Sequence, residues 1–383
     1  MISLLIAVIY LSFISLGLPD SLLGSAWPLM YKEFDVPISY SGIVFFIISA
    51  CTVYTSLQSD RLIKKFGTGK IAAFSILLTC ISLFGFGFSK SYISLCFWAF
   101  PYGLGAGSID VALNNYVALH YESRHMSWLH CMWGLGASVG PYIMSNAILK
   151  TNTWNYGYFY IGIIQTVIFF VVLMSLPLWN DNKTTGESSN TEVLSLKQIL
   201  NIRGCKPILV SFFCYCAIEQ TVGLWASSYL VLKAGLDEAI ASGFASLFYI
   251  GITIGRALNG FLTYKLSDSK LIYSGLSIIG IGTLLLFFNI SDIASLVGFS
   301  LIGLGCAPVY PCTIHSTPAI FGEENAQAMI GVQMASAYAG IMLMPPIFGV
   351  IARNISISLL PLYLFIILII EILTYYVAQK ANN

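Results

Sequence analysis

The sequence contains few charged residues. Asp, Glu, Lys and Arg together make up 9% of its 383 residues, whereas hydrophobic residues make up 57%. A typical soluble domain has about 25% charged residues, so a protein of this composition would not stay dissolved in water. The net charge of +1 gives no reason to expect a nucleic-acid partner. We therefore expect a membrane protein embedded in a lipid bilayer, with spans of about 20 residues.

The sequence also lacks the motifs of enzymes and metal sites. Its nine cysteines are scattered through apolar segments, and the closest pair, Cys214 and Cys216, has neither zinc-site nor redox spacing. We interpret them as packing residues. We find no nucleophile–base arrangement and no phosphate-binding loop, and we predict no catalytic residue, metal or cofactor. No Lys or Arg precedes Lys32, so we expect the first apolar segment to be a retained span rather than a signal peptide.

Apolar runs between polar breaks predict an all-α membrane protein with twelve transmembrane helices. If the N-terminus is cytoplasmic, twelve Lys and Arg residues face the cytoplasm and five face outward, as the positive-inside rule requires. Both termini are then cytoplasmic, and the short loops suit a bacterial plasma (inner) membrane. The predicted spans are residues 3–30, 40–58, 70–88, 92–118, 126–149, 155–178, 207–232, 239–264, 270–288, 293–318, 326–352 and 357–378.

One long polar break, residues 180–192, divides the chain almost in half. We expect an N-terminal six-helix bundle at residues 1–179, a cytoplasmic linker at 180–206 and a C-terminal six-helix bundle at 207–383. Within the linker, the apolar spacing over residues 196–203 fits a short helix lying flat on the membrane surface. A plain linker fits equally well.

The two halves repeat each other at an offset near 200 residues. Two six-helix bundles related by a repeat are typical of secondary transporters, in which the site lies near mid-membrane between the halves. Asp20 is followed four residues later by Gly24, and Glu219 by Gly223. The other matching pairs are Ser41-Gly42 with Ser242-Gly243, Gly103-Leu104-Gly105 with Gly303-Leu304-Gly305, Gly136 with Gly340, and Pro141 with Pro345.

Three carboxylates, Asp20, Asp110 and Glu219, lie inside long apolar stretches. Such a residue persists in a membrane mainly where it faces the protein interior or a wet cavity. Burial disfavours the charged form of an acid, so an acid there can take up and release a proton as the cavity opens to either side. We expect at least one of the three to couple transport to protons. Permanently paired structural acids are the alternative.

The surroundings of these acids indicate a polar cavity. Pro19 cannot donate a backbone hydrogen bond, so the helix beside Asp20 is weakened, as in discontinuous helices that line cavities. In the seventh span the acid is followed by Gln220 and Trp225, which are candidates to bind substrate. Arg256 is the only Lys or Arg in the interior of a predicted span, away from its ends. We expect it to pair with one of the acids and to take part in gating.

The fourth span presents an acid and an amide on one helical face. Gly103, Gly107, Asp110 and Asn114 share that face, and the glycines allow close helix contact. A carboxylate accepts hydrogen bonds and an amide both donates and accepts them, so the pair could bind a polyhydroxylated ligand. An interhelical hydrogen bond is the structural alternative. The neighbouring Asn115 is a further candidate to bind substrate.

The fifth span places His130 and Trp133 on one face. An indole beside a polar group suits sugar binding, because the ring can stack on the apolar face of a pyranose. Tryptophan is also common at membrane interfaces, and His130 fits a ligand contact, a proton relay or a packing role. The remaining candidates to bind substrate are Tyr310, His315 and Gln333.

These residues resemble the major facilitator superfamily and, within it, the fucose–proton symporter family. The resemblance covers the whole chain. It is carried by Asp20 in the first span, by the run Gly103-Leu-Gly-x-x-x-x-Asp110-x-x-x-Asn114, and by His130…Gly136…Gly140-Pro141. It implies the major facilitator fold, alternating access and proton-coupled sugar uptake. It also implies that one of Asp20 and Asp110 transfers the proton and the other recognises sugar.

The loop after the second span partly matches the superfamily's gating motif. Asp60, Arg61 and the following lysines match its acid and bases, whereas Ser56 and Ile63 replace its glycines. The resemblance therefore implies a gating role for Asp60 and Arg61. We do not infer that fucose is the substrate. The acid of the fourth span is an Asp where the fucose transporter has a Glu, and Glu219 adds a third acid.

The leading hypothesis is a monomeric symporter for a sugar or a similar polar small molecule, driven by protons or by sodium. A proton-driven exporter of drugs or metabolites on the same fold is the alternative, although the polar candidates favour a polar ligand. A membrane enzyme lacks support because no catalytic motif is present. A sensor lacks support because no soluble signalling segment is present.

Overall fold

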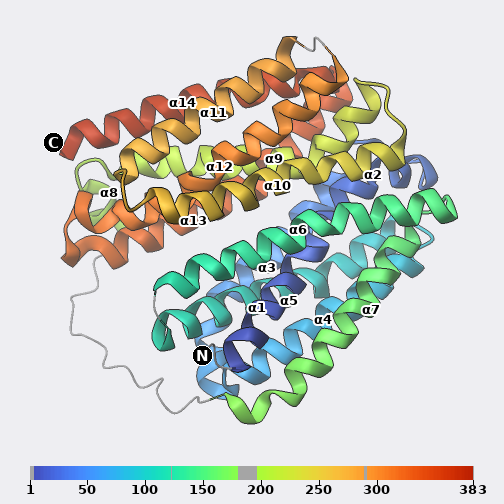
Figure 1. The fold of residues 1–383 in the computed structure, drawn as a ribbon, viewed down its shortest axis with the longest axis horizontal. Coiled ribbons are helices and arrows are strands. Elements are labelled where there is room, and N and C mark those ends of the chain that lie inside the picture. The colour runs from blue at the N-terminus through green and yellow to red at the C-terminus, as the bar shows by residue number, and fades with distance from the viewer. Residues whose placement is uncertain (1–3, 122, 180–195, 289–290, 383) are drawn as a thin grey trace.

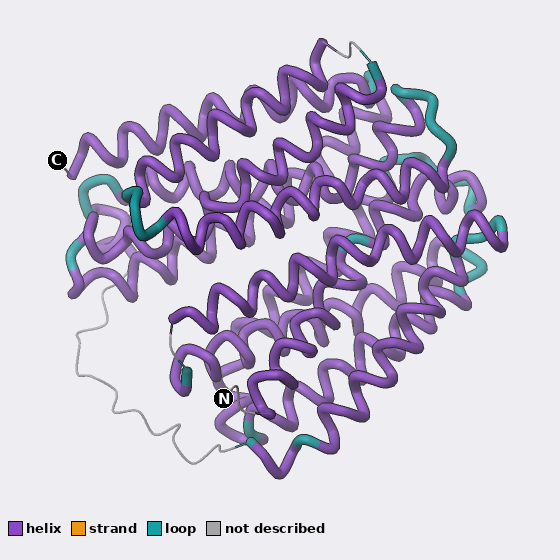
Figure 2. The backbone as a smooth tube through the Cα atoms, in the orientation of Figure 1, coloured by secondary structure: helices purple, strands orange, loops and turns teal. Residues whose placement is uncertain are grey.

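The computed structural model describes residues 4–121, 123–179, 196–288 and 291–382. The described residues form helices joined by short loops, with no strand among them (Figure 1, Figure 2). The predicted all-α class is confirmed. Within the described part of the chain, ten helices are long and apolar enough to cross a membrane.

Each predicted span coincides with a long helix, and the first span is divided into α1 and α2. The first half contains α1 (Leu4–Asp20), α2 (Leu22–Glu33), α3 (Tyr40–Phe66), α4 (Thr68–Phe88), α5 (Tyr92–His120), α6 (Ser123–Thr151) and α7 (Asn155–Met174). The second half contains α9 (Cys205–Leu232), α10 (Glu238–Leu262), α11 (Asp268–Phe288), α12 (Asp292–Phe321), α13 (Glu323–Asn354) and α14 (Leu360–Asn382).

A short helix, α8 (Leu196–Asn201), precedes the second half. It occupies the segment for which the sequence predicts either a surface helix or a plain linker, and its placement at a membrane surface stays a prediction. The rest of the polar break, residues 180–195, lies outside the described residues.

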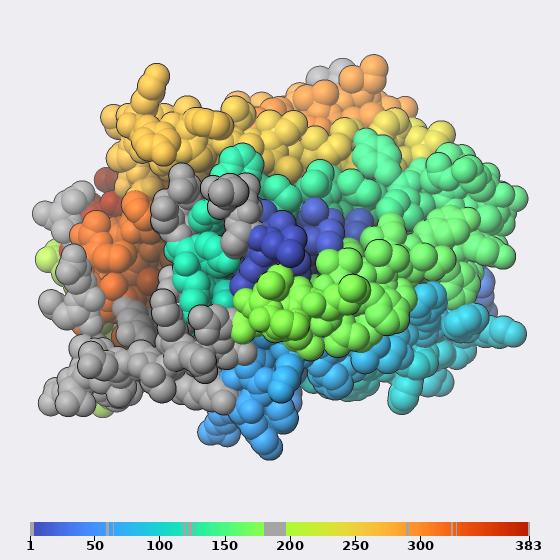
Figure 3. Space-filling model, turned by 60° about the horizontal axis from the view of Figure 1, so that its bottom comes forward, coloured from blue at the N-terminus to red at the C-terminus, as the bar shows by residue number. Residues whose placement is uncertain are grey.

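The helices pack as two bundles (Figure 1). In the first bundle, α1 packs on α6, and α5 packs on α3 and α4. In the second bundle, α12 packs on α10 and α11, and α9 packs on α13 and α14. The bundles meet where α2 packs on α9, α6 on α10, and α3 on α13. On the face shown in Figure 3, α1 (dark blue) is bordered by α6 and α7 of its own bundle.

The internal repeat is visible in the helix crossings. A Cβ atom added at Gly103 of α5 would lie 2.3 Å from the carbonyl oxygen of Ile48, and one added at Gly303 of α12 would lie 1.9 Å from that of Phe248. Ile48 belongs to α3 and Phe248 to α10, which are repeat-related helices. The glycines that match in sequence therefore serve the same purpose in both halves, which is to let two helix backbones touch.

The repeated acid–glycine pattern marks the place where the two halves meet. A Cβ atom at Gly24 of α2 would lie 2.5 Å from the carbonyl oxygen of Gly223 in α9. Nearby, the Ser227 hydroxyl donates to the backbone oxygen of Ser25 at 3.3 Å. At the end of α2, the ammonium of Lys32 lies 2.6 Å from a carboxylate oxygen of Glu238 at the start of α10. The bundles are thus held together at this end of the molecule.

Candidate transport site

Asp20 lies at the break between α1 and α2. The helix is interrupted at Ser21, next to Pro19, as the sequence predicts. The Tyr102 hydroxyl of α5 donates to one carboxylate oxygen at 3.0 Å, and the Trp133 indole N–H of α6 donates to the other at 2.8 Å. Although Asp20 lies mid-way along the 30-residue span Leu4–Glu33, it is exposed. Its partner Trp133 also contacts Arg256 of the second bundle, which places Asp20 near the bundle interface.

The hydrogen bonds of Asp20 fit both of its protonation states. An indole N–H can only donate, whereas a tyrosine hydroxyl can donate or accept. When Asp20 is ionised, both partners donate to it, as the distances indicate. When it is protonated, it can donate to Tyr102 and still accept from Trp133. A proton can therefore be added at this site without moving a helix.

Trp133 connects Asp20 to the second bundle. The guanidinium carbon of Arg256 in α10 lies over the indole ring, 5.1 Å from its centroid, which is the geometry of a cation–π contact. Tyr249, two turns earlier on α10, meets the same ring edge-to-face at 6.4 Å between centroids. The contact therefore joins α6 to α10, which lie on opposite sides of the bundle interface.

Glu219 is the partner of Arg256 in the second bundle. A carboxylate oxygen of Glu219 lies 3.9 Å from Arg256 Nη2, and the Tyr215 hydroxyl donates a hydrogen bond to its other oxygen. The side chain of Arg256 is 12% exposed and that of Glu219 is 10% exposed. The predicted pairing of the membrane-embedded cation with an acid is thus present. Asp20, Trp133, Arg256 and Glu219 form one continuous series of contacts across the interface.

Asp110 and Asn114 pair with each other on α5. The Asn114 amide donates to the Asp110 carboxylate at 2.9 Å and to the Asp110 backbone oxygen at 2.9 Å. Both residues are half-buried, and Asn115 is exposed. Both hydrogen bonds of this pair lie within α5, so the carboxylate and the amide oxygen can still accept hydrogen bonds from a ligand.

His130 lies at the interface, one turn from Trp133 on α6. Its ring is edge-on to Phe13 at 5.8 Å and lies 6.5 Å from the ring of Tyr310 in α12. The Tyr310 hydroxyl is 3.2 Å from the sulfur of Met334. His130 and Tyr310 therefore face each other from opposite bundles, so these two candidates do come together.

Other predicted site residues lie elsewhere. Trp225 is fully buried and donates to the Pro345 backbone oxygen, so it packs between α9 and α13. Gln333 is fully buried and accepts from Thr317 of α12. The His315 side chain is 81% exposed and lies 2.7 Å from Asp268, the first residue of α11. The contacts of these three residues join neighbouring helices of one bundle rather than lining the interface.

The remaining candidates have fewer described contacts. Gln220 follows Glu219 in α9 and is half-buried. Arg61 is exposed near the end of α3. The side chain of Asp60 lies outside the described residues, so the gating role of Asp60 and Arg61 stays a prediction.

Comparison with known proteins identifies the family. The sequence profile of the Major Facilitator Superfamily matches residues 9–288 and 208–383. The chain belongs to the major facilitator superfamily. It is accordingly an integral, multi-pass membrane protein of a transporter family, as the sequence predicts.

Named relatives of this superfamily member include sugar transporters. The glucose/mannose transporter GlcP of Bacillus subtilis (strain 168) is 25% identical over 343 residues, covering 86% of this chain and 84% of the relative. The human sodium-dependent glucose transporter 1 is 22% identical, covering 89% and 72%. The cis,cis-muconate transport protein of Acinetobacter baylyi (strain ATCC 33305 / BD413 / ADP1) is 24% identical, covering 77% and 74%. All three are named as transporters rather than enzymes.

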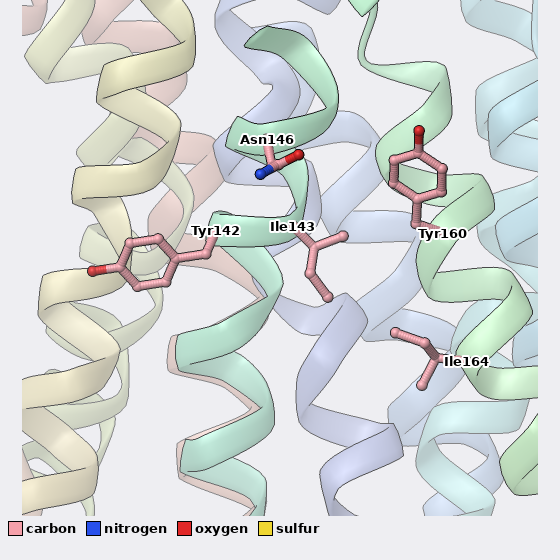
Figure 4. Close-up of a pocket in the computed structure, with 5 residues that line it drawn as sticks. All are labelled: Tyr142, Ile143, Asn146, Tyr160 and Ile164. Atoms are coloured by element: carbon pink, nitrogen blue, oxygen red, sulfur yellow. The ribbon is translucent and has the colours of Figure 1, made fainter. Parts of the chain in front are cut away.

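A groove on the first bundle of this transporter lies away from the contacts just described. It is bordered by residues of α6 and α7, and Figure 4 shows Asn146 of α6 and Tyr160 of α7 lining it. Neither Trp133 nor Asp20 is among its lining residues. Its other lining residues are Tyr142, Ile143 and Ile164. None of the five is a predicted site residue, and we assign the groove no part in transport.

Sequence reasoning missed a fourth intramembrane acid, Glu371 of α14. Its side chain is fully buried, and neither carboxylate oxygen has a hydrogen-bond partner among the described residues. The signal was available, because Glu371 is the only acid in the apolar span Ile357–Ala381. An unpaired charge is strongly disfavoured in such surroundings, so we interpret Glu371 as a neutral, protonated acid.

Replacing Glu371 by methionine should stabilise the transporter. A buried polar group without a partner costs about 1–3 kcal/mol, and methionine fills a similar volume with apolar atoms. We expect Glu371→Met to raise the melting temperature of the detergent-purified protein. Glu238→Met, which removes the paired and partly exposed carboxylate that contacts Lys32 across the bundles, is the comparison variant and should lower the melting temperature. A fall in melting temperature for Glu371→Met would contradict this account.

Proposed function

We propose that this transporter takes up a sugar, or a similar polyhydroxylated small molecule, together with protons. The observation that carries the proposal is the Asp20–Trp133 contact: an interior carboxylate held by the N–H of an indole at the bundle interface. The carboxylate can accept hydroxyl hydrogen bonds, and the indole offers a flat apolar surface. Glucose in the names of two relatives supports a sugar as substrate.

The polar residues divide into two groups with separate tasks. Asp20 and Trp133 border the interface from α1 and α6, while Asp110 and Asn114 offer a second set of hydroxyl partners from α5. Asp20 is our choice for the proton carrier, because its partners accommodate both of its protonation states. Asp110 and Asn114 then recognise substrate, with His130 and Tyr310 facing each other across the interface.

Alternating access follows from the way the bundles meet. Contacts at Gly24–Gly223 and Lys32–Glu238 hold the bundles together at one end. With the termini in the cytoplasm, Lys32 lies on the outer side, so this conformation is closed to the outside. We include in the proposal the division into bundles at residues 1–179 and 207–383, a monomeric state and a bacterial inner-membrane location.

Uptake into proteoliposomes tests the proposal directly. We expect a labelled monosaccharide from a panel to accumulate when the lumen is made more alkaline than the medium, and not when a protonophore collapses the gradient. Accumulation that follows a sodium gradient at equal pH would replace the proton by sodium. If no monosaccharide is transported under either gradient, the sugar function is wrong. Resistance profiling of an overexpressing strain would then test the exporter alternative.

A carboxylate substrate, as the name of the muconate relative suggests for that protein, has less support here. The candidate site contains three acids, Asp20, Asp110 and Glu219, and one cation, Arg256, which already lies beside Glu219. An anionic substrate would therefore meet a surplus of negative charge. We expect muconate to compete poorly with monosaccharides in the same uptake assay.

A further inference from the structure

We propose that Arg256 and the substrate sugar compete for the same face of the Trp133 indole, and that the sugar drives Arg256 onto Glu219. The inference deepens the proposed function and rests on it, because it takes Trp133 as the stacking surface. Arg256 then acts as a positioning residue that transmits sugar binding from the first bundle to the second.

The contacts of Trp133 define which part of its ring a sugar can reach. The N–H edge is held by Asp20 at 2.8 Å. The guanidinium of Arg256 lies over the ring, 5.1 Å from its centroid. A pyranose stacks through its C–H groups on an aromatic face, so a sugar on the face that Arg256 covers would take the position that Arg256 holds. The bond to Asp20 can persist during the exchange, because it uses the edge of the indole and not its face.

The distance from Arg256 to Glu219 shows where the cation can go. At 3.9 Å, Nη2 and Oε1 are close enough for electrostatic attraction and too far apart for a hydrogen bond. Tyr215 already donates to the other carboxylate oxygen, which leaves Oε1 available. A shift of about 1 Å would form a charge-assisted hydrogen bond. Arg256 therefore contacts both Trp133 of the first bundle and Glu219 of the second, and in the proposal a tighter contact with Glu219 draws the guanidinium off the indole ring.

This exchange makes Arg256 a determinant of specificity. A ligand displaces it only by offering the indole a sufficiently apolar surface. Pyranoses whose hydroxyl groups are all equatorial expose C–H groups on both faces, so they should displace Arg256 better than sugars with axial hydroxyls on the stacking face. A small polyol without a ring should not displace it.

A double-mutant experiment on the purified protein tests the competition. Glu219→Gln removes the destination of Arg256, so we expect glucose, used as the probe, to bind about tenfold more weakly, within the range of about 2- to 30-fold that a cation–π contact supports. Adding Arg256→Met should restore the affinity to the wild-type level or better. Arg353→Met, at the end of α13, is the matched control and should bind as the wild type does. A double variant that stays as weak as Glu219→Gln overturns the proposal, because Glu219 would then contact the sugar itself.

Acrylamide quenching without sugar separates this inference from the sugar function. The fluorescence of Trp133 is obtained as the difference between each protein and its Trp133→Phe version. We expect Trp133 to be more accessible to quencher in the double variant than in Glu219→Gln, because the guanidinium no longer covers the ring. Equal quenching would show that Arg256 does not cover the indole. If quenching changes as expected while no monosaccharide binds any variant, the proposed sugar function is wrong. The position of Arg256 over the indole, within reach of Glu219, is then still supported.

Discussion

Asp20→Asn should abolish sugar accumulation while leaving sugar binding and exchange in place. In one-to-one coupling, a gradient of about one pH unit supplies about 1.4 kcal/mol, which concentrates a substrate about tenfold. Without an ionisable group at Asp20, we expect the ratio of internal to external sugar to fall from about ten to about one. The measurement is uptake of the labelled sugar into proteoliposomes under an imposed pH gradient, compared with counterflow at equal pH.

The geometry explains why this substitution is a clean test. An asparagine at position 20 can accept from Trp133 with its oxygen and donate to the Tyr102 hydroxyl with its amide, so both hydrogen bonds survive with one direction reversed. Asp268→Asn makes the same chemical change at the start of α11, beside His315, and should leave accumulation unaltered. If Asp20→Asn still accumulates sugar, another acid carries the proton, and Asp110→Asn becomes the next variant to test.

Gly303→Ala should cause the largest loss of stability among single-methyl substitutions in this protein. The added Cβ atom would lie 1.9 Å from the Phe248 carbonyl oxygen and 2.9 Å from its carbonyl carbon. Because these are backbone atoms, they cannot move aside as a side chain can, and α10 and α12 would have to separate. Overpacking of a helix interface costs typically about 1–3 kcal/mol and occasionally more, and we expect at least the upper end. A strongly lowered melting temperature, or loss of the monodisperse peak in size-exclusion chromatography, would show it.

Gly260→Ala is the matched control for this prediction. Gly260 lies in α10, and a Cβ atom added there meets nothing within 4 Å. Alanine in a helix interior is favoured over glycine by about 0.5–1 kcal/mol, so this variant should be unchanged or slightly more stable. If both alanine variants melt at the wild-type temperature, the close crossing of α10 and α12 does not determine stability.

Much of the fold could be predicted from the sequence, because hydropathy reports directly on membrane spans. The end of α3 shows the limit of that signal. The predicted span ends at residue 58, whereas α3 continues to Phe66, because backbone hydrogen bonding persists after the apolar run gives way to charged residues. Similarly, α5 and α6 are not among the ten helices that pass as spans on length and composition. These are the helices that carry Asp110, Asn114, His130 and Trp133.

The residue types of the candidate site could be predicted from the sequence, but the directions in which their side chains point could be predicted less well. An acid in a span can be recognised from its neighbours in sequence, and Asp20 was. The partner of a side chain depends on how helices rotate against each other, which a nearly uniform apolar sequence does not encode. Trp225 and Gln333 therefore looked equivalent to Trp133 and Gln220 in the sequence, yet they pack between helices of the second bundle. The contact between Trp133 and Arg256 could be recognised only from the tertiary structure.

The duplicated framework carries unequal chemistry in its two halves. Gly136 and Gly340 are 204 residues apart, and the same offset pairs Trp133 with Ala337. Ser41 and Ser242 are 201 residues apart, and that offset pairs Thr55 with Arg256. Neither Trp133 nor Arg256 therefore has a chemically similar residue at the matching position of the other half. An ancestor made of two identical subunits would thus have had each of these side chains twice or not at all. Asp20 is held by the neutral donors Tyr102 and Trp133, whereas its counterpart Glu219 lies beside the cation Arg256, so repeat-related acids have different electrostatic surroundings.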